Sequence, residues 1–229
     1  MHKTIVICGA SRGIGKALVT LLSKDQAFRL VVLSRNVEAL RRDYEGLTHV
    51  EIVPFDLEKD TEEQLKNVLP NLGPIHALIN NAGHLEKGKV TELGMELYQR
   101  CMQVNFLGPV SLVKTLYPLL CEGKAHVVNV STMGAYQGSV KFPELTAYAA
   151  SKAAIANFTE VFAEEQKATG IRMNCLCLGA VNTEMLRTAF PGYEAEITPE
   201  AMANFIADFT LKSGKLFNGK IIPVSSSTP

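Results

Sequence analysis

Short runs of apolar, largely β-branched residues recur along the chain, and stretches with helical periodicity, such as 15–24 and 146–167, separate them. The runs are nearly continuous rather than alternating, which is the pattern of parallel strands buried on both faces. Strands and helices in this alternation predict a doubly wound α/β sheet, with right-handed crossovers that place helices on both faces. The runs lie at 4–8, 30–33, 50–53, 77–79, 127–130, 173–178 and 221–224.

The length of 229 residues suits one domain, and neither an internal repeat nor a linker divides residues 1–229. Basic and acidic side chains number 23 each, so the formal net charge is zero. This balance argues against a surface for nucleic acid or anionic membrane, and any anion site must be built locally. No run approaches the ~20 apolar residues of a membrane span, and no secretory signal is visible.

Five cysteines, an odd number, fall mostly within apolar segments, which indicates reduced thiols in a cytoplasmic protein. Cys175 and Cys177 are spaced to share one face of a strand, but no second ligand pair accompanies them. We interpret both as core residues and expect no metal site.

A glycine-rich turn follows the first apolar run and precedes a helical stretch. Small residues let the backbone approach a pyrophosphate there, and the helix start offers unpaired N–H groups and a positive dipole end. The spacing is G-x-x-x-G-x-G rather than the commoner G-x-G-x-x-G, and such a turn can also be purely structural. Its place between strand and helix favours dinucleotide binding by Gly9, Ser11, Arg12, Gly13, Ile14 and Gly15.

The end of the second run indicates which dinucleotide is bound. An NAD-binding protein usually carries an acid there, about 20 residues after the last glycine, for the ribose 2′-hydroxyl. Here Ser34 takes that place and Arg35 follows it. A guanidinium can bind a 2′-phosphate with two hydrogen bonds, and Arg12 could supply a second cation. Two solvated arginines are the alternative, but their joint placement favours NADP(H).

Polar residues also follow the third and fourth runs. Asp56, which precedes Leu57, can accept a hydrogen bond from an adenine amino group, or it can be a turn aspartate or a helix cap. A turn of Asn81, Ala82 and Gly83 closes the fourth run. An asparagine there can bridge loop backbones or meet the cofactor ribose, and an ordinary turn is the alternative.

Tyr148 and Lys152 are four residues apart near the start of a helical stretch, so they share one helix face. A phenol with a pKa of ~10 is a poor acid at neutral pH, but a nearby ammonium stabilises the phenolate and lowers that pKa. Such a pair is common by chance, and a surface pair on an amphipathic helix is the alternative. Ser131, after the fifth run, favours catalysis, because its hydroxyl could donate to a substrate carbonyl oxygen.

Two further residues belong to this hypothesis. Asn105 lies in the helical stretch before the fifth run, where a buried asparagine is unfavourable unless its side chain is hydrogen-bonded. A water between its backbone and Lys152 could carry protons to bulk solvent; a polar helix residue satisfied by solvent is the alternative. Thr132 is the second choice of hydroxyl, after Ser131.

Taken together and in this order, the motifs resemble those of the short-chain dehydrogenase/reductase family, in its single-domain branch. The resemblance spans roughly the whole chain. The motifs are Gly9-x-x-x-Gly13-x-Gly15, Asn80-Asn81-Ala82-Gly83, Asn105, Ser131 and Tyr148-x-x-x-Lys152.

The resemblance implies a Rossmann fold with a seven-stranded parallel sheet, and hydride transfer between nicotinamide C4 and a carbonyl or alcohol. In reduction, Tyr148 would give its proton to the oxygen. Lys152 would bind the nicotinamide ribose and tune Tyr148, Ser131 would hold the carbonyl, and Asn105 would support a proton relay. Thr183 stands at the usual place for contact with the carboxamide.

The chain also departs from the family pattern. Cys8 precedes the first glycine where threonine is usual, and Leu178 replaces a proline after the sixth run. Ser131 and Tyr148 are 17 residues apart, a longer interval than is usual. Residues 137–144 must therefore bulge outward, into the substrate mouth. The later segment 182–197 is expected to be irregular and to lie at the ligand-binding edge of the sheet.

The resulting hypothesis is an NADPH-dependent carbonyl reductase that acts on a modest, uncharged or weakly polar ketone or aldehyde. The alternatives are an alcohol dehydrogenase that works oxidatively, and a non-catalytic NADP(H) sensor or interaction module. Surplus apolar side chains on 95–117 and 146–167 predict a homodimer or homotetramer, with no nucleic-acid or membrane partner. The expected pocket lining is apolar: Leu85, Met133, Tyr136, Phe142, Met185, Leu186, Phe190 and Tyr193.

Overall fold

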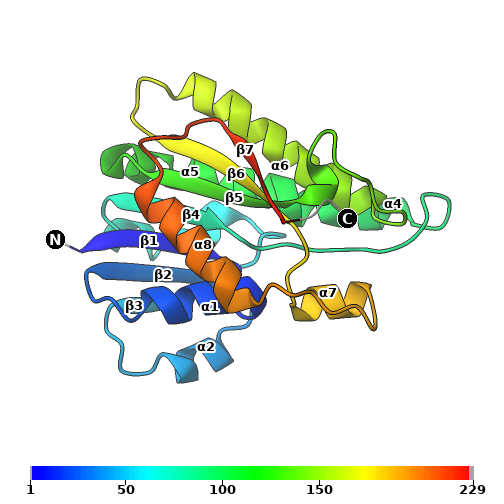
Figure 1. Cartoon of the computed structure of the whole chain (residues 1–229). Coiled ribbons are helices and arrows are strands. Elements are labelled where there is room, and N and C mark those ends of the chain that lie inside the picture. Colours follow the sequence, from blue (N-terminus) through cyan, green and yellow to red (C-terminus); the bar gives the residue numbers. More distant parts are fainter. Residues whose placement is uncertain (1, 227–229) are drawn as a thin grey trace.

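The computed structural model describes residues 2–226, and its centre is a sheet of seven parallel strands (Figure 1). The strand order is β3-β2-β1-β4-β5-β6-β7. This confirms the predicted doubly wound α/β class, a Rossmann-type arrangement. The strands are β1 (Lys3–Cys8), β2 (Phe28–Ser34), β3 (Val50–Pro54), β4 (Ile75–Asn80), β5 (His126–Thr132), β6 (Arg172–Leu178) and β7 (Ile221–Val224).

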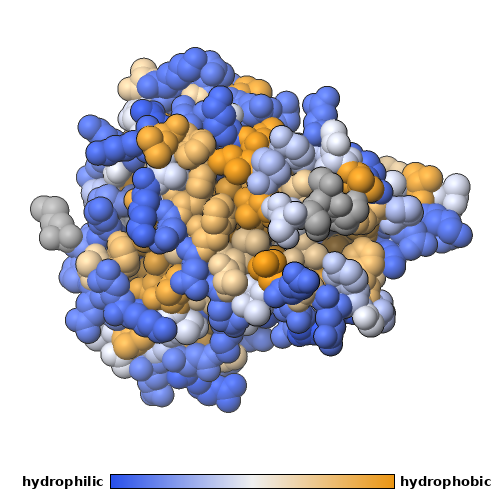
Figure 2. Space-filling view, in the orientation of Figure 1, coloured by the Kyte–Doolittle hydropathy of each residue, from blue (hydrophilic) through white to orange (hydrophobic). Residues whose placement is uncertain are grey.

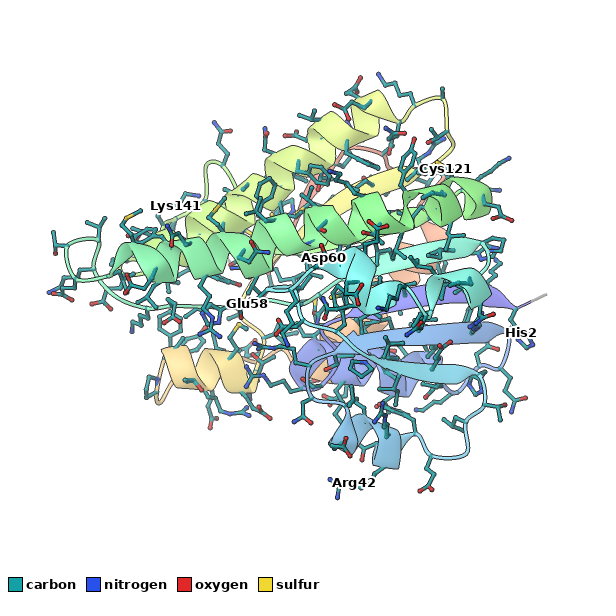
Figure 3. The ribbon with its side chains drawn as sticks, turned by 180° about the vertical axis from the view of Figure 1, so that it is seen from behind. His2, Arg42, Glu58, Asp60, Cys121 and Lys141 are labelled. Carbon is teal, nitrogen blue, oxygen red and sulfur yellow. The ribbon has the colours of Figure 1, made fainter. Side chains whose placement is uncertain are left out.

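Helices cover both faces of the sheet, as Figures 1 and 3 show from opposite sides. The helices α1 and α8 pack together on one face, while α5 and α6 lie on the other. The α-helices are α1 (Gly13–Leu22), α2 (Glu38–Asp43), α3 (Thr61–Leu65), α4 (Met95–Met102), α5 (Gly108–Gly123), α6 (Thr146–Glu165), α7 (Glu184–Ala189) and α8 (Pro199–Lys212). Shorter turns are η1 (Leu69–Asn71), the π-helical η2 (Gln103–Leu107) and η3 (Met133–Ala135).

The strands are apolar throughout because each buries both of its faces. In β1, Ile5 and Ile7 join the core beneath α1 and α8, and the alternate residues Val6 and Cys8 join the core beneath α5. Successive side chains of a strand point to opposite faces, so a strand covered on both sides must be apolar at every position. All four of these side chains are almost wholly buried.

The chain reverses its direction of travel across the sheet next to β1. It proceeds outward through β2 and β3, then returns to place β4 on the other side of β1. The ends of β1, β2 and β4 therefore meet, with Cys8 paired to both Leu33 and Asn80. Loops leaving the carboxyl ends of strands diverge at such a point and leave a crevice between them.

Two local differences from the sequence analysis affect this edge. The segment 182–197, expected to be irregular, contains the short helix α7, which begins after Thr183 because the Thr183 hydroxyl accepts a hydrogen bond from the Leu186 N–H. The strand β5 continues through Thr132, two residues beyond its predicted end.

The helical run Met95–Gly123 is long and apolar enough, by length and composition alone, to cross a membrane, although the sequence showed no such apolar run. The run joins α4, η2 and α5. Leu112, Leu116 and Leu120 on α5 are fully buried and pack against the sheet. A core helix passes the same test of length and composition, so this run is weak evidence for a membrane span.

Candidate active site

A cavity of about 620 Å³ lies at the carboxyl edge of the sheet. It gathers residues from the β1–α1 loop, from the ends of β2, β4 and β5, from α6 and from the segment around α7. Among the predicted catalytic and cofactor-binding residues, Gly15 and Asn105 are not part of its lining. The others line it: Gly9, Ser11, Arg12, Gly13, Ile14, Ser34, Arg35, Asp56, Leu57, Asn81, Ala82, Gly83, Ser131, Tyr148, Lys152 and Thr183.

The glycines of the first loop are required by close approach. A Cβ at Gly9 would lie 2.4 Å from the Ala82 Cα, and a Cβ at Gly15 would lie 1.9 Å from the Gly9 carbonyl oxygen. Gly9 and Gly13 also have positive φ angles, of 88° and 54°, which side chains disfavour. Gly15 thus packs against the backbone of the loop, while Gly9 and Gly13 line the cavity.

The start of α1 fits an anionic ligand. Arg12 at its N-cap makes no side-chain cap, and the first turn carries no acidic residue. The backbone N–H groups of a helix start need hydrogen-bond acceptors, and the positive dipole end favours anions. A pyrophosphate would meet both needs in this cradle.

Both arginines predicted to bind a 2′-phosphate are paired with glutamates. The Arg12 guanidinium lies 3.5 Å from the Glu184 carboxylate, and that of Arg35 lies 3.6 Å from Glu58, which Figure 3 labels. Both arginine side chains are more than half exposed. Ser34 is buried and donates to the Asn36 carbonyl oxygen at 3.3 Å. The cations are therefore present at the cavity, each paired with a glutamate, and Glu58 also pairs with Arg100 at 3.3 Å.

Several residues predicted to contact the cofactor also make hydrogen bonds within the protein. An Asp56 carboxylate oxygen accepts from the Glu58 N–H at 3.1 Å, as a turn aspartate does. The Asn81 side-chain amide donates to the Gly9 carbonyl oxygen at 2.6 Å and so bridges two loop backbones. Thr183 caps α7. The contact of Asp56 matches the structural alternative, and that of Asn81 matches the predicted bridge between loop backbones, while both residues still face the cavity.

Lys152 is buried, and its ammonium donates to the backbone carbonyl oxygens of Val130 at 2.8 Å and Ala82 at 3.3 Å. Burial lowers its pKa to about 8, because desolvation disfavours the charged form.

Tyr148 faces the same cavity, and burial raises its pKa to about 12, while a hydrogen bond with the Thr132 hydroxyl acts in the opposite direction. The Lys152 ammonium, one helical turn away, was predicted to lower this pKa. The shift has the opposite sign because loss of solvent around the phenolate outweighs the favourable contacts.

The Ser131 hydroxyl is engaged by the backbone of α6. Its Oγ donates to the Lys152 backbone carbonyl oxygen at 2.9 Å, and the residue is almost wholly buried. Thr132, the second choice, lines the same cavity as Tyr148, and hydrogen bonding by its hydroxyl acts to lower the pKa of Tyr148. The longer β5 accounts for this difference between the two hydroxyls, since Ser131 lies within the strand beneath α6 and Thr132 ends it.

Asn105 holds two segments together rather than lining the cavity. Its side chain accepts from the His84 N–H at 2.8 Å, and donates to the His84 carbonyl oxygen at 2.8 Å and to the Ser151 hydroxyl at 2.9 Å. These bonds satisfy a buried asparagine within the π-helical turn η2, as the sequence analysis required. Asn105 thus fixes the loop after β4 against α6, and sequence reasoning missed its partners His84 and Ser151.

The far end of the cavity is apolar, as predicted. The insertion 137–144 contributes Phe142 to its wall, and Leu145 was missed by the sequence analysis. Tyr136 does not line the cavity, because it packs against the buried cluster of Met133, Cys175 and Cys177. The remaining predicted residues line it: Leu85, Met133, Phe142, Met185, Leu186, Phe190 and Tyr193. Within residues 2–226, no group of three or more His, Cys, Asp or Glu side chains could hold a metal ion.

Comparisons with known proteins agree with this arrangement. A family model described as short chain dehydrogenase matches residues 3–194. An uncharacterized oxidoreductase of Staphylococcus aureus (strain MRSA252) is 27% identical over 209 residues, covering 89% of each chain.

Two solved structures share the fold. The structure of ElxO with NADP bound matches with a TM-score of 0.84 at 21% identity, over 98% of this chain and 97% of that one. A 4-hydroxyisoleucine dehydrogenase complexed with NADH matches with a TM-score of 0.86 at 24% identity, over 99% and 98%. At these identities the likeness shows the fold alone.

The buried ammonium of Lys152 makes stability depend on pH. Folding lowers its pKa from 10.5 to about 8. Below about pH 8 the folded and the unfolded chain both bind the proton, and the cost of burying the charge is fully present. Between pH 8 and 10.5 only the unfolded chain binds it. The free energy of unfolding therefore rises with pH in this range. Tyr148 acts in the opposite sense above pH 10, where the unfolded phenol ionises first.

We expect the free energy of unfolding of the wild type, measured relative to Lys152→Met, to rise by about 1–2 kcal/mol between pH 8 and 10. Urea titrations at several pH values measure this difference. Lys114→Met, on an exposed position of α5, is the control and should run parallel to the wild type. A Lys152→Met profile parallel to the wild type would show that the ammonium is not buried.

Proposed function

The chain belongs to the short-chain dehydrogenase/reductase family, and from this membership we propose that it is an NADP(H)-dependent reductase of carbonyl compounds, with Tyr148 as its proton donor. The observation that carries the proposal is the gathering of Tyr148, Lys152 and Thr132 in one cavity with the glycine loop. A bound nicotinamide would supply or accept the hydride, and the chain would bind, orient and move protons.

The cofactor would lie along the predicted residues. The start of α1 would hold the pyrophosphate, and Arg12 and Arg35 would hold the 2′-phosphate in exchange for Glu184 and Glu58. Fold neighbours are known with either NADP or NADH bound. The preference for NADP(H) therefore rests on this chain's own residues, namely Ser34 in the place of an acid and Arg35 beside it.

Catalysis would use the hydroxyl pair of Tyr148 and Thr132. With its pKa raised to about 12, Tyr148 keeps its proton at neutral pH and can donate it to a carbonyl oxygen during reduction. The Thr132 hydroxyl would donate a hydrogen bond to the same oxygen, the role that the sequence analysis gave to Ser131. Lys152, with a pKa of about 8, is charged at neutral pH and would stabilise the phenolate that remains.

We also propose a cytoplasmic homodimer or homotetramer. None of the five cysteines is in a disulfide, which supports a reducing compartment. Exposed apolar side chains lie on the predicted helices, namely Met95, Leu107 and Val161. Further apolar surface gathers over α8 and β7 (Figure 2), with Phe205 and Leu216 exposed. Exposed apolar patches mark interaction surfaces, and a second copy would cover them.

The cofactor proposal predicts that Arg35→Ala weakens NADPH binding about ten- to a hundredfold, because a charged hydrogen bond contributes ~1.5–3 kcal/mol. NADH affinity should barely change. Fluorescence titration of the reduced cofactors measures both constants. The control is Arg41→Ala, an exposed arginine on α2 that pairs with Glu38. Tighter binding of NADH than NADPH by the wild type would refute the proposal.

The catalytic proposal predicts that Tyr148→Phe loses about 10²–10⁴-fold in turnover while NADPH affinity stays near the wild-type value, because only the acid is removed. NADPH absorbance with the best carbonyl substrate measures turnover. Wild-type turnover in Tyr148→Phe would exclude this role. A non-catalytic NADP(H) sensor would show no turnover to lose.

The exchange of roles between the two hydroxyls predicts that Thr132→Ala lowers turnover more than Ser131→Ala. The hydroxyl of Ser131 is engaged by the helix backbone, so its loss should chiefly lower thermal stability. Kinetics and melting curves on the two variants separate these effects. A larger loss of turnover in Ser131→Ala would restore Ser131 as the catalytic hydroxyl.

The assembly proposal predicts a species of two or four chains at micromolar concentration, because the exposed apolar faces are buried on association. Sedimentation equilibrium measures the mass directly. A species of only 25.0 kDa, the mass of one chain, would contradict it.

A further inference from the structure

Three segments from distant parts of the chain meet at the apolar end of the cavity. Lys87 belongs to one of these segments and contacts the other two. Lys87 lies on the loop after β4. The insertion loop, residues 137–144, is the first of the two contacted segments. The α7 segment, residues 184–193, is the second.

The Lys87 ammonium is held from several sides. It donates to the Ala189 carbonyl oxygen at 3.1 Å and lies 4.7 Å from the centroid of the Phe190 ring, so two contacts fix the α7 segment. It also lies 3.6 Å from the Glu144 carboxylate, at the end of the insertion loop. Both charged side chains are only about one-third exposed, at 36% and 38%. Partly desolvated contacts of a cation are stronger than those on an open surface.

The backbone of Glu144 gives independent support for this junction. Glu144 has a φ of 66°, in the left-handed region that residues other than glycine rarely adopt. Its carbonyl oxygen accepts from the Gly88 N–H at 2.9 Å, next to Lys87. An unfavourable backbone conformation persists only where surrounding contacts hold it, and such positions concentrate at functional sites.

The two segments that Lys87 joins carry opposite parts of the cavity wall. Phe142, two residues before Glu144, lines the cavity from the insertion loop, and Phe190 lines it from the α7 segment. Lys87 touches the ring of Phe190 directly and positions Phe142 through Glu144. Its charge is occupied by a carboxylate and a carbonyl oxygen, so the rings rather than the ammonium face the substrate.

We propose that Lys87 is a positioning residue that fastens the two walls of the substrate mouth, and that this enclosure favours carbonyl compounds with an apolar chain. The preference for such substrates rests on the proposed reductase function, whereas the fastening of the walls does not. Lys87 itself touches neither substrate nor cofactor.

Limited trypsin digestion tests the fastening without any assay of activity. The insertion loop contains Lys141 (labelled in Figure 3) and the α7 segment contains Arg187, both exposed, so each wall carries its own cleavage site. Lys87→Met should be cut at both sites about three- to tenfold faster than the wild type, because the cation contacts are lost. Lys87→Arg keeps the charge and should be cut at the wild-type rate.

The matched control is Lys89→Met, which removes a neighbouring lysine that forms an ion pair with Glu92. It should leave both cleavage rates unchanged. Glu144→Gln removes one charge while keeping the backbone bond to Gly88, and should accelerate cleavage at Lys141 by a smaller factor. It serves in place of Lys87→Met should that variant fail to fold. Cleavage of Lys87→Met and Glu144→Gln at wild-type rates would overturn the proposal.

Steady-state kinetics test the substrate preference, with acetone and 2-octanone as a short and a long apolar ketone. In Lys87→Met the KM for 2-octanone should rise about three- to tenfold. The kcat, the KM for acetone and the NADPH dissociation constant should all stay within about twofold, an allowance for small indirect effects on neighbouring packing. An equal rise in both KM values, or none, would overturn the preference. A wild type that reduces no carbonyl compound would refute the proposed function. The digestion result would then still test whether Lys87 holds the two cavity walls together.

Discussion

One ammonium group, that of Lys152, lies inside the protein, and the surrounding elements are placed to accept it. A charge removed from water is costly unless hydrogen bonds replace its hydration. Here the carbonyl oxygens of Val130 and Ala82 do so, and they come from β5 and from the loop after β4. Lys152 itself is on α6. A shift of any of these elements would cost the charge at least one partner, so the ammonium helps to fix the geometry around Tyr148, one helical turn away.

Close backbone packing fixes the cofactor side of the same cavity. Gly9 leaves no room for a Cβ against Ala82, the residue whose carbonyl oxygen also accepts from Lys152. Gly15 in turn lies directly beneath the Gly9 carbonyl, and Asn81 donates to that carbonyl. The loops after β1 and β4 therefore act as one unit. The reversal of strand order beside β1 brings them together, and the missing side chains let them approach.

The sequence predicts the parts of this site that depend on periodicity and on residue type. All seven strands follow from apolar runs, and the glycine loop follows from its place after the first of them. Ser131 was ranked before Thr132, but the contacts of the two hydroxyls depend on where β5 ends, which the sequence does not show. Asn105 was predicted to need a hydrogen bond if its side chain is buried, but its partners belong to segments distant in the chain and could not be predicted. Tyr136 was misplaced because an apolar ring suits a core and a cavity wall equally well.

The charged groups of the site fall into two kinds, which have different consequences. Lys152 is buried, so its contacts are strong and its position cannot vary without large cost. Arg12 and Arg35 are exposed, and exposed ion pairs contribute only about 0–1 kcal/mol. Their glutamate partners can therefore be exchanged for another anion at little cost. A chain with no net charge can thus keep a proton-transfer centre rigid while leaving its anion-binding cations free to change partners.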